Sequence, residues 1–113
     1  MPSFSTLGEF ELLVLMAVLR LGERAYGSAV RDELEARTSR RISRGAVYVT
    51  LDRLDGKRLL TSRLADRPPE QGGHPLRLYR VSPAGRKAVA AAVSDVAQMR
   101  SGIESLLPLK GAR

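Results

Sequence analysis

The sequence contains no cysteine and no tryptophan, and it has a single histidine, His74. Without cysteine there is no disulfide bond, no thiolate metal site and no cysteine nucleophile. The sequence also lacks a phosphate-binding glycine loop and a cluster of metal-ligating residue types. We therefore expect neither an enzyme nor a protein with a cofactor or bound metal ion. We expect His74 to be an exposed loop residue.

A long hydrophobic run is also missing. The longest lies within residues 12–19, far short of the roughly 20 residues that span a bilayer. Glu9 and Glu11 precede it, where a signal peptide would carry positive charge. The sequence therefore predicts a soluble, cytoplasmic protein with no membrane partner, and the absence of cysteine fits a reducing cytosol.

What the sequence does contain is an excess of positive charge. The 113 residues, enough for about one domain, have a net charge of +7 and a pI near 10.8. Residues 37–58 hold seven Lys or Arg and two Asp or Glu, a net charge of +5, whereas residues 1–36 are net negative. This excess indicates an anionic partner, and composition leaves nucleic acid, an acidic membrane surface and an acidic protein open.

The first predicted helix covers residues 9–21. Thr6 and Glu9 form a capping-box pattern at its start, and Gly22 is the expected stop. The helix is apolar on two sides, so in a domain this small one side is expected to meet a second subunit. The residues assigned to that side are Leu12, Leu15, Met16 and Leu19.

Two more helices are predicted next along the chain. One covers residues 26–37, and the next starts at the N-cap residue Ser43 and runs to about Lys57. Val47, Leu51 and Leu54 recur at the spacing of one buried helical stripe. At the end of this helix, Lys57 and Arg58 are expected to favour the negative end of the helix dipole.

Two strands and a last helix complete the expected order. The strands cover residues 60–64 and 76–81, and the segment 65–75 between them is too long and too rich in Pro and Gly for a tight turn. Ser82 and Pro83 start a helix that is expected to reach about Leu107, where Pro108 ends it. Its apolar seam, made of Val89, Val93, Val96, Ile103 and Leu107, favours pairing with another chain over packing onto its own domain.

Three helices followed by a hairpin predict a winged helix-turn-helix. The fold class is mainly α with a small β-hairpin (α+β): residues 1–82 form the DNA-binding domain, and residues 83–113 form a dimerisation helix and tail. In this fold the third helix enters the major groove of DNA with its N-terminal end, which here carries Ser43, Arg44 and Gly45. The charge distribution agrees with that geometry.

The chain resembles the PadR family of transcriptional regulators. The matching stretches are residues 7–15, 25–27, 42–48, 51–54 and 79–85. The resemblance implies a homodimer held by the first and last helices that binds a pseudo-palindromic operator, usually as a repressor. Some relatives release DNA when a small molecule binds, and no such effector is identified for this chain. The chain resembles the short subgroup with one C-terminal helix, and it has no Trp to stack a flat aromatic drug.

Individual residues are assigned to the DNA surface with differing roles. Arg44 is expected to reach a guanine edge or a phosphate, and Arg40 and Arg41 to reach phosphates. Tyr26 and Tyr48 fit either core packing or phosphate contact, and the resemblance favours contact for Tyr48. The complete set is Tyr26, Arg40, Arg41, Ser43, Arg44, Gly45, Tyr48, Arg53, Arg67 and Arg77.

Two other functions stay open at this stage. A winged helix can serve as a protein–protein interaction module, which predicts no salt-dependent affinity for DNA. A basic domain can bind RNA, but recognition of single strands uses exposed stacking aromatics, and this chain has three Tyr and two Phe in all.

Overall fold

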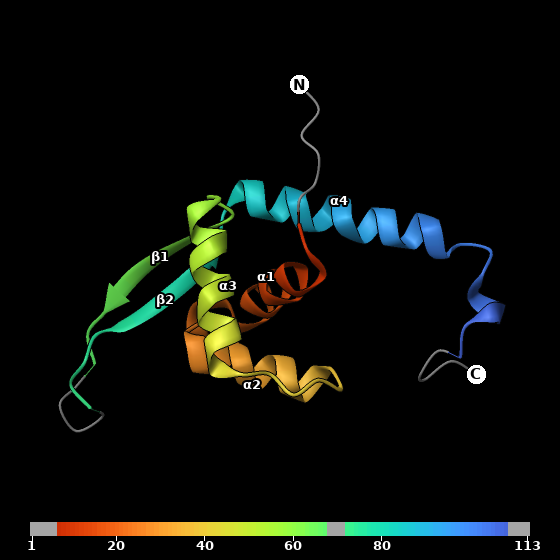
Figure 1. Cartoon of the computed structure of the whole chain (residues 1–113). Helices are drawn as coiled ribbons and strands as arrows, with labels where there is room; N and C mark the ends of the chain where they lie inside the picture. Colours follow the sequence, from red (N-terminus) through yellow and green to blue (C-terminus); the bar gives the residue numbers. More distant parts are fainter. Residues whose placement is uncertain (1–6, 68–71, 109–113) are drawn as a thin grey trace.

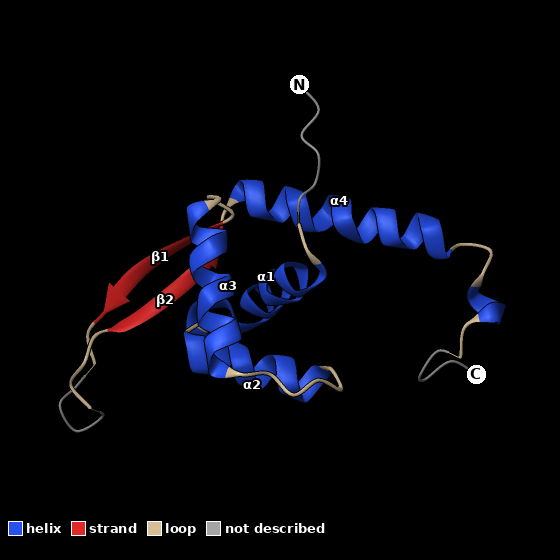
Figure 2. Ribbon diagram, in the orientation of Figure 1, coloured by secondary structure: helices blue, strands red, loops and turns tan. Residues whose placement is uncertain are grey.

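The computed structural model describes residues 7–67 and 72–108. Four helices and one antiparallel hairpin follow the predicted order (Figures 1 and 2). Their bounds are α1 Glu9–Leu21, α2 Gly27–Arg37, α3 Arg44–Gly56, β1 Leu60–Ala65, β2 Leu76–Val81 and α4 Pro83–Arg100, with short 3-10 turns at Gly22–Arg24 and Glu104–Leu106. The α+β winged helix-turn-helix is confirmed. Of the described helices, none has the length and apolar character needed to cross a membrane.

A single hydrophobic core lies between α1, α2, α3 and the hairpin. The residues predicted to form the buried stripe of α3, Val47, Leu51 and Leu54, are all fully buried. Leu15 of α1 is fully buried beside them, so it has no surface to offer a second subunit and the prediction that it faces one is wrong. The other buried apolar residues are Val14, Ala17, Val18, Ala25, Val30, Leu34, Ile42, Leu60, Tyr79, Val81 and Val89.

The start of α1 differs from the prediction. Its N-cap is Gly8, and the Glu11 carboxylate accepts a hydrogen bond from the Gly8 amide at 2.9 Å. The predicted capping box placed this role on Glu9 with Thr6 as cap; Thr6 lies outside the described residues, and Glu9 is the first residue of the helix. The predicted stop holds, because Gly22 takes the left-handed φ of 61° that glycine adopts without steric cost.

The caps of α3 and α4 follow the sequence signals. The Ser43 hydroxyl accepts a hydrogen bond from the Ala46 amide, and the Ser82 hydroxyl accepts one from the Gly85 amide. Pro83 occupies the first helical position of α4, where its missing N–H costs nothing.

The end of α3 is a Schellman motif. The Leu59 amide donates to the Leu54 carbonyl at 3.0 Å, and the Arg58 amide donates to the Asp55 carbonyl at 2.9 Å. This geometry places Arg58 at a φ of +63°, a region that glycine usually occupies.

The two strands pair from Leu60 opposite Val81 to Ala65 opposite Leu76. Because side chains alternate along a strand, Ser62 and Tyr79 lie on one face of the hairpin and Arg63 and Arg80 on the other. The first face packs against α3 and the core. The Tyr79 amide also donates to the carbonyl of Ala25, which fastens the entry of α2 to β2. Pro68 and Pro69 of the predicted loop lie outside the described residues.

Helix α4 ends earlier than predicted. It stops at Arg100 instead of Leu107, because Ser101 is extended and Gly102 has a φ of 93°. Ile103 and Leu107 therefore do not continue a helical seam, which corrects that part of the prediction. Figure 1 shows the C-terminal half of α4 extending away from the other helices.

Candidate nucleic-acid interface

One face of α3 is exposed along its whole length. We call it the recognition stripe; it consists of Arg44, Gly45, Tyr48, Val49, Asp52 and Arg53. The members recur at the four-residue spacing of one helical face, opposite the buried stripe. An exposed helix face beside a hairpin has the shape that enters a major groove about 12 Å wide. The sequence assigns Arg44, Gly45, Tyr48 and Arg53 to the DNA surface, whereas Val49 and Asp52 are not in that set.

The N-terminal end of the stripe carries free positive charge. Arg44 and Arg41 are exposed, and neither makes an ion pair or side-chain hydrogen bond within the described part of the chain. The first amide groups of α3 add the partial positive charge of a helix N-terminus. This end is suited to a phosphate or an electron-rich base edge.

The turn before α3 is held by an Arg–Glu pair from α2. Arg31 Nε donates to the carbonyl of Ile42 at 2.7 Å, and the Ile42 amide donates to Glu35 Oε2 at 2.9 Å. Arg31 Nη2 and Glu35 Oε2 lie 3.8 Å apart. Both backbone polar groups of Ile42 are therefore satisfied, and its side chain is buried, which positions the following Ser43 and Arg44. Neither Arg31 nor Glu35 is among the residues that the sequence assigns to the DNA surface.

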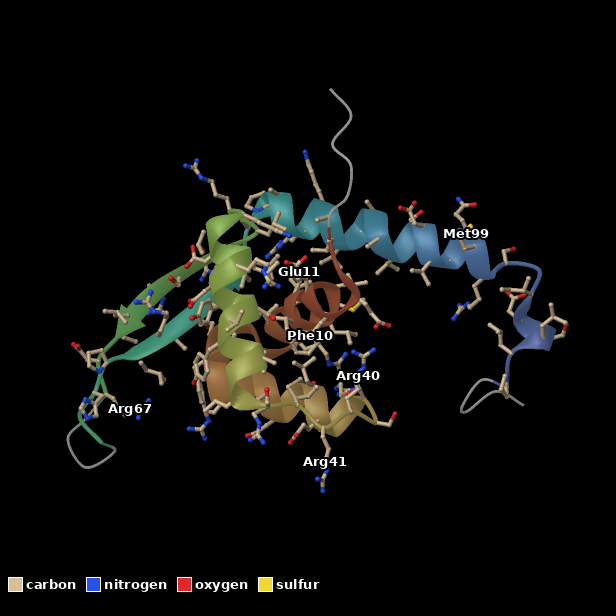
Figure 3. The ribbon with its side chains drawn as sticks, viewed as in Figure 1. Phe10, Glu11, Arg40, Arg41, Arg67 and Met99 are labelled. Carbon is tan, nitrogen blue, oxygen red and sulfur yellow. The ribbon has the colours of Figure 1, made fainter. Side chains whose placement is uncertain are left out.

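The other end of α3 is tied to α1 by an ion pair. Lys57 Nζ lies 2.9 Å from Oε2 and 3.0 Å from Oε1 of Glu11, whose side chain is 7% exposed (Figure 3). Burial acts to raise the pKa of Glu11, but hydrogen bonds from Gly8 and Lys57 and the charges of Lys57 and Arg53 hold the pKa below its ordinary value. Lys57 thus contacts a carboxylate on another helix, a role that the helix-dipole interpretation did not foresee.

The two tyrosines lie at the junction of α2 and α3. The Tyr48 ring packs directly against Gly27, where a Cβ would overlap the ring, yet 41% of Tyr48 is exposed. Packing and DNA contact are therefore compatible for Tyr48. Tyr26 is half-buried as the N-cap of α2 and bridges to Leu78 of β2.

Arg40 and Arg41 differ although they are adjacent. Arg40 Nη2 lies 2.7 Å from Glu9 Oε1, and Figure 3 shows it between α1 and α2 near Phe10. Arg41 points away from the body of the molecule in the same view. Arg41 is therefore free to meet a phosphate, whereas Arg40 would first have to leave Glu9.

A chain of hydrogen bonds joins the wing, which is the β1–β2 hairpin, to α3. Arg77 Nη1 donates to Ser62 Oγ at 3.0 Å, and Ser62 Oγ donates to Asp55 Oδ2 at 3.0 Å. Burial, followed by the negative charge of Asp52, raises the pKa of Tyr79. Arg67 is half-buried at the far end of the hairpin (Figure 3). DNA contact by Arg67 and Arg77 stays a prediction.

The predicted dimerisation residues differ in their burial. Leu15 and Val89 belong to the core of their own chain. Leu12 and Met16 are half-buried, while Leu19, Val93 and Val96 are 41%, 43% and 58% exposed. Met99, which the sequence analysis did not include, is 78% exposed near the end of α4 (Figure 3). The exposed members form an apolar surface on α1 and α4.

Comparison with known proteins identifies a family. Residues 15–91, more than half of the chain, match the family described as the transcriptional regulator PadR-like family. A comparison with curated protein sequences gives no significant match.

Solved structures share the fold. A PadR family transcription regulator from Clostridium difficile superimposes with a TM-score of 0.73 at 15% identity, over 88% of this chain and 98% of that one. A PadR-like regulator from Bacillus cereus gives 0.71 at 18% identity, over 89% and 93%. A PadR family regulator from Eggerthella lenta gives 0.68 at 24% identity, over 90% and 88%.

Proposed function

Because the chain belongs to the PadR-like family of transcriptional regulators, we propose that it is a homodimeric repressor that binds a pseudo-palindromic operator in double-stranded DNA. Its family and fold are those of transcription regulators, which bind DNA and are not enzymes. The proposal for this chain itself concerns three points: which residues contact DNA, that the protein is a homodimer, and that it represses transcription.

The observation that carries the proposal is the recognition stripe, whose cationic end has no ion-pair partner among the described residues. Arg44 reads a base edge in the major groove, and the backbone amides at the start of α3 and the Arg41 guanidinium contact phosphates. Tyr48 contributes its exposed edge, and Arg53 contacts the backbone further along the stripe. The wing contributes Arg67 and Arg77 beside the same groove.

The dimer is supported by the apolar surface on α1 and α4. Val93, Val96 and Met99 are exposed and recur on one face of α4, and exposed apolar patches often mark protein–protein contacts. We assign DNA reading to residues 1–82 and dimerisation to residues 83–113, with Leu12, Met16 and Leu19 of α1 completing the contact. A two-fold dimer explains why the operator is pseudo-palindromic.

Repression follows if the operator overlaps the start of a transcription unit, because the bound dimer then excludes RNA polymerase. A protein with this role works in the cytoplasm, where bacterial-type DNA is transcribed.

The test is footprinting of the full chain on the DNA upstream of its own gene. We expect two protected half-sites whose centres are about 10 bp or a multiple of that apart. Transcription from the same DNA in vitro should fall when the protein is added. Equal protection of all sequences would contradict specific reading, and increased transcription would contradict repression.

A further inference from the structure

An open cavity of about 390 Å³ lies on the side of the hairpin that turns away from α3. It is formed by the C-terminal half of α1, the 3-10 turn that follows, both strands and the start of α4. Its volume falls within the range of small-molecule sites, roughly 300–1,000 Å³. Its lining includes no residue of the recognition stripe, and Leu19 is the lining residue that the proposed dimer contact also contains.

The walls of the cavity combine two kinds of surface. Val18, Leu19 and Leu78 supply apolar side chains. Three arginines, Arg63 of β1, Arg80 of β2 and Arg86 of α4, supply positive charge at the same opening. Such a mixture is suited to a ligand with an apolar body and a negatively charged group.

The three arginines differ from several other arginines of the chain in their pairing. None of them makes an ion pair or side-chain hydrogen bond within the residues that the structure describes. Glu23 is the acidic residue among those lining the cavity, and it is not paired with any of the three. By contrast, Arg20, Arg31, Arg37 and Arg40 all pair with glutamates.

The pairing register brings two of these charges close together. Arg80 lies opposite Thr61, and Arg63 lies opposite Leu78, so Arg63 and Arg80 are diagonal neighbours on one face. Diagonal neighbours in an antiparallel pair are about 7–8 Å apart, and like charges at this spacing repel each other. A bound anion would relieve that repulsion.

Arg63 and Arg80 lie on the side of the hairpin away from the recognition stripe. The opposite hairpin face carries Ser62, which donates to Asp55 of α3. Since alternate residues of a strand point to opposite faces, Arg63 and Arg80 point away from α3. Their charge is therefore not placed to serve the DNA surface.

We propose that this cavity binds a small organic carboxylate with a compact aliphatic body. The carboxylate lies between the guanidinium groups of Arg63, Arg80 and Arg86, since guanidinium donors match the two carboxylate oxygens in a bidentate geometry. The aliphatic body lies against Val18 and Leu78. The site is independent of DNA binding.

The test is an NMR titration of the ¹⁵N-labelled full chain with cyclohexanecarboxylate, in the absence of DNA. We expect saturable shifts of the Leu19, Thr61 and Leu78 amides with a Kd of about 1 mM, the range of small ligands of this size. Cyclohexanecarboxamide, which lacks the charge, and inorganic phosphate, which lacks the apolar body, should each bind at least about tenfold more weakly.

Variants separate the site from general charge effects. The double variant Arg63→Gln/Arg80→Gln should lose at least about tenfold in carboxylate affinity, whereas the control Arg100→Gln, exposed on α4 outside the cavity, should bind as the wild type. If the double variant does not fold, Arg86→Gln takes its place. Equal binding of the amide or of phosphate overturns the proposal. Unchanged carboxylate affinity in the variants also overturns it. So does a wild type that binds no carboxylate while the variants bind duplex DNA more weakly.

Discussion

Arginines at nearby positions of this chain differ in whether they are ion-paired. Arg40 pairs with Glu9 and Arg31 pairs with Glu35 while holding the Ile42 carbonyl, but Arg44 has no partner within the described residues. An unpaired arginine at the exposed start of α3 therefore has its full hydrogen-bonding capacity left for a ligand.

The first prediction concerns Arg44→Ala. Losing a bidentate contact to a base edge should weaken operator binding by about 1–3 kcal/mol, or roughly 5- to 150-fold in Kd. Fluorescence anisotropy on the footprinted operator measures this change. Arg100→Ala, which removes the same charge from the far end of α4, is the matched control and should bind nearly as the wild type. Equal affinities of the two variants would remove Arg44 from the interface.

A second residue-scale prediction concerns the positive φ of Arg58. Because only glycine adopts this region without steric cost, Arg58→Gly should raise the free energy of unfolding by about 0.5–1 kcal/mol. Arg58→Ala removes the same charge but keeps the strain, so it should show no such gain. Urea unfolding at one protein concentration distinguishes the two variants. A gain in both would mean that charge, not backbone conformation, limits stability here.

At the scale of elements, both ends of α3 are fixed by side chains from other helices. Arg31 and Glu35 hold the turn before it, and Glu11 holds Lys57 at its end. These contacts set the angle of the recognition stripe relative to α1 and α2.

The pair at the end of α3 gives a pH-dependent prediction. Glu11→Gln should lower the free energy of unfolding at pH 7 by about 1–2 kcal/mol, because it removes a charged hydrogen-bond acceptor. The pKa of Glu11 is lower in the folded chain than its ordinary 4.5. Its contribution is therefore present above about pH 4.5 and is lost as the pH falls through the folded pKa.

Unfolding curves from pH 7 down to pH 3 test this sign. The difference between the wild type and Glu11→Gln should be constant near neutrality and shrink in acid. Glu23→Gln, an exposed carboxylate with no ion pair within the described residues, should show no comparable difference. A difference that grows in acid would contradict the assignment.

The elements show what the sequence predicts and why. Ser43, Ser82 and Pro83 mark helix starts through local hydrogen bonds, so α3 and α4 begin where expected. The sequence predicts too late an end for α4, because Ile103 and Leu107 continue the apolar spacing of the helix. The helix in fact ends where Ser101 is extended and Gly102 has a positive φ.

The candidate site was predictable only in part. The exposed end of α3 follows from helix spacing and charge. The Glu11–Lys57 pair joins residues 46 positions apart. The hydrogen bonds to the backbone of Ile42 come from Glu35 and Arg31, which are 7 and 11 positions away. Neither leaves a periodic signal in the sequence, since both depend on how the helices cross.

At the scale of the whole molecule, the apolar surface on α1 and α4 predicts a dimer that one charge can break. Val93→Asp places a carboxylate in the centre of the proposed contact, so light scattering should give a mass near 12.3 kDa instead of twice that value. Ala91→Asp adds the same charge on the opposite side of α4 and should remain dimeric. An unchanged mass for Val93→Asp would rule out this surface as the dimer contact.

The central claim is that the chain reads duplex DNA as a dimer through α3 and the wing. The most direct measurement is the Kd for the footprinted operator and for a random duplex of equal length between 50 and 200 mM salt. We predict that the operator binds at least about 10³-fold more tightly at physiological salt, and that both affinities fall with salt as released counterions require. Equal affinity for the two duplexes, or affinity that does not change with salt, would contradict the claim.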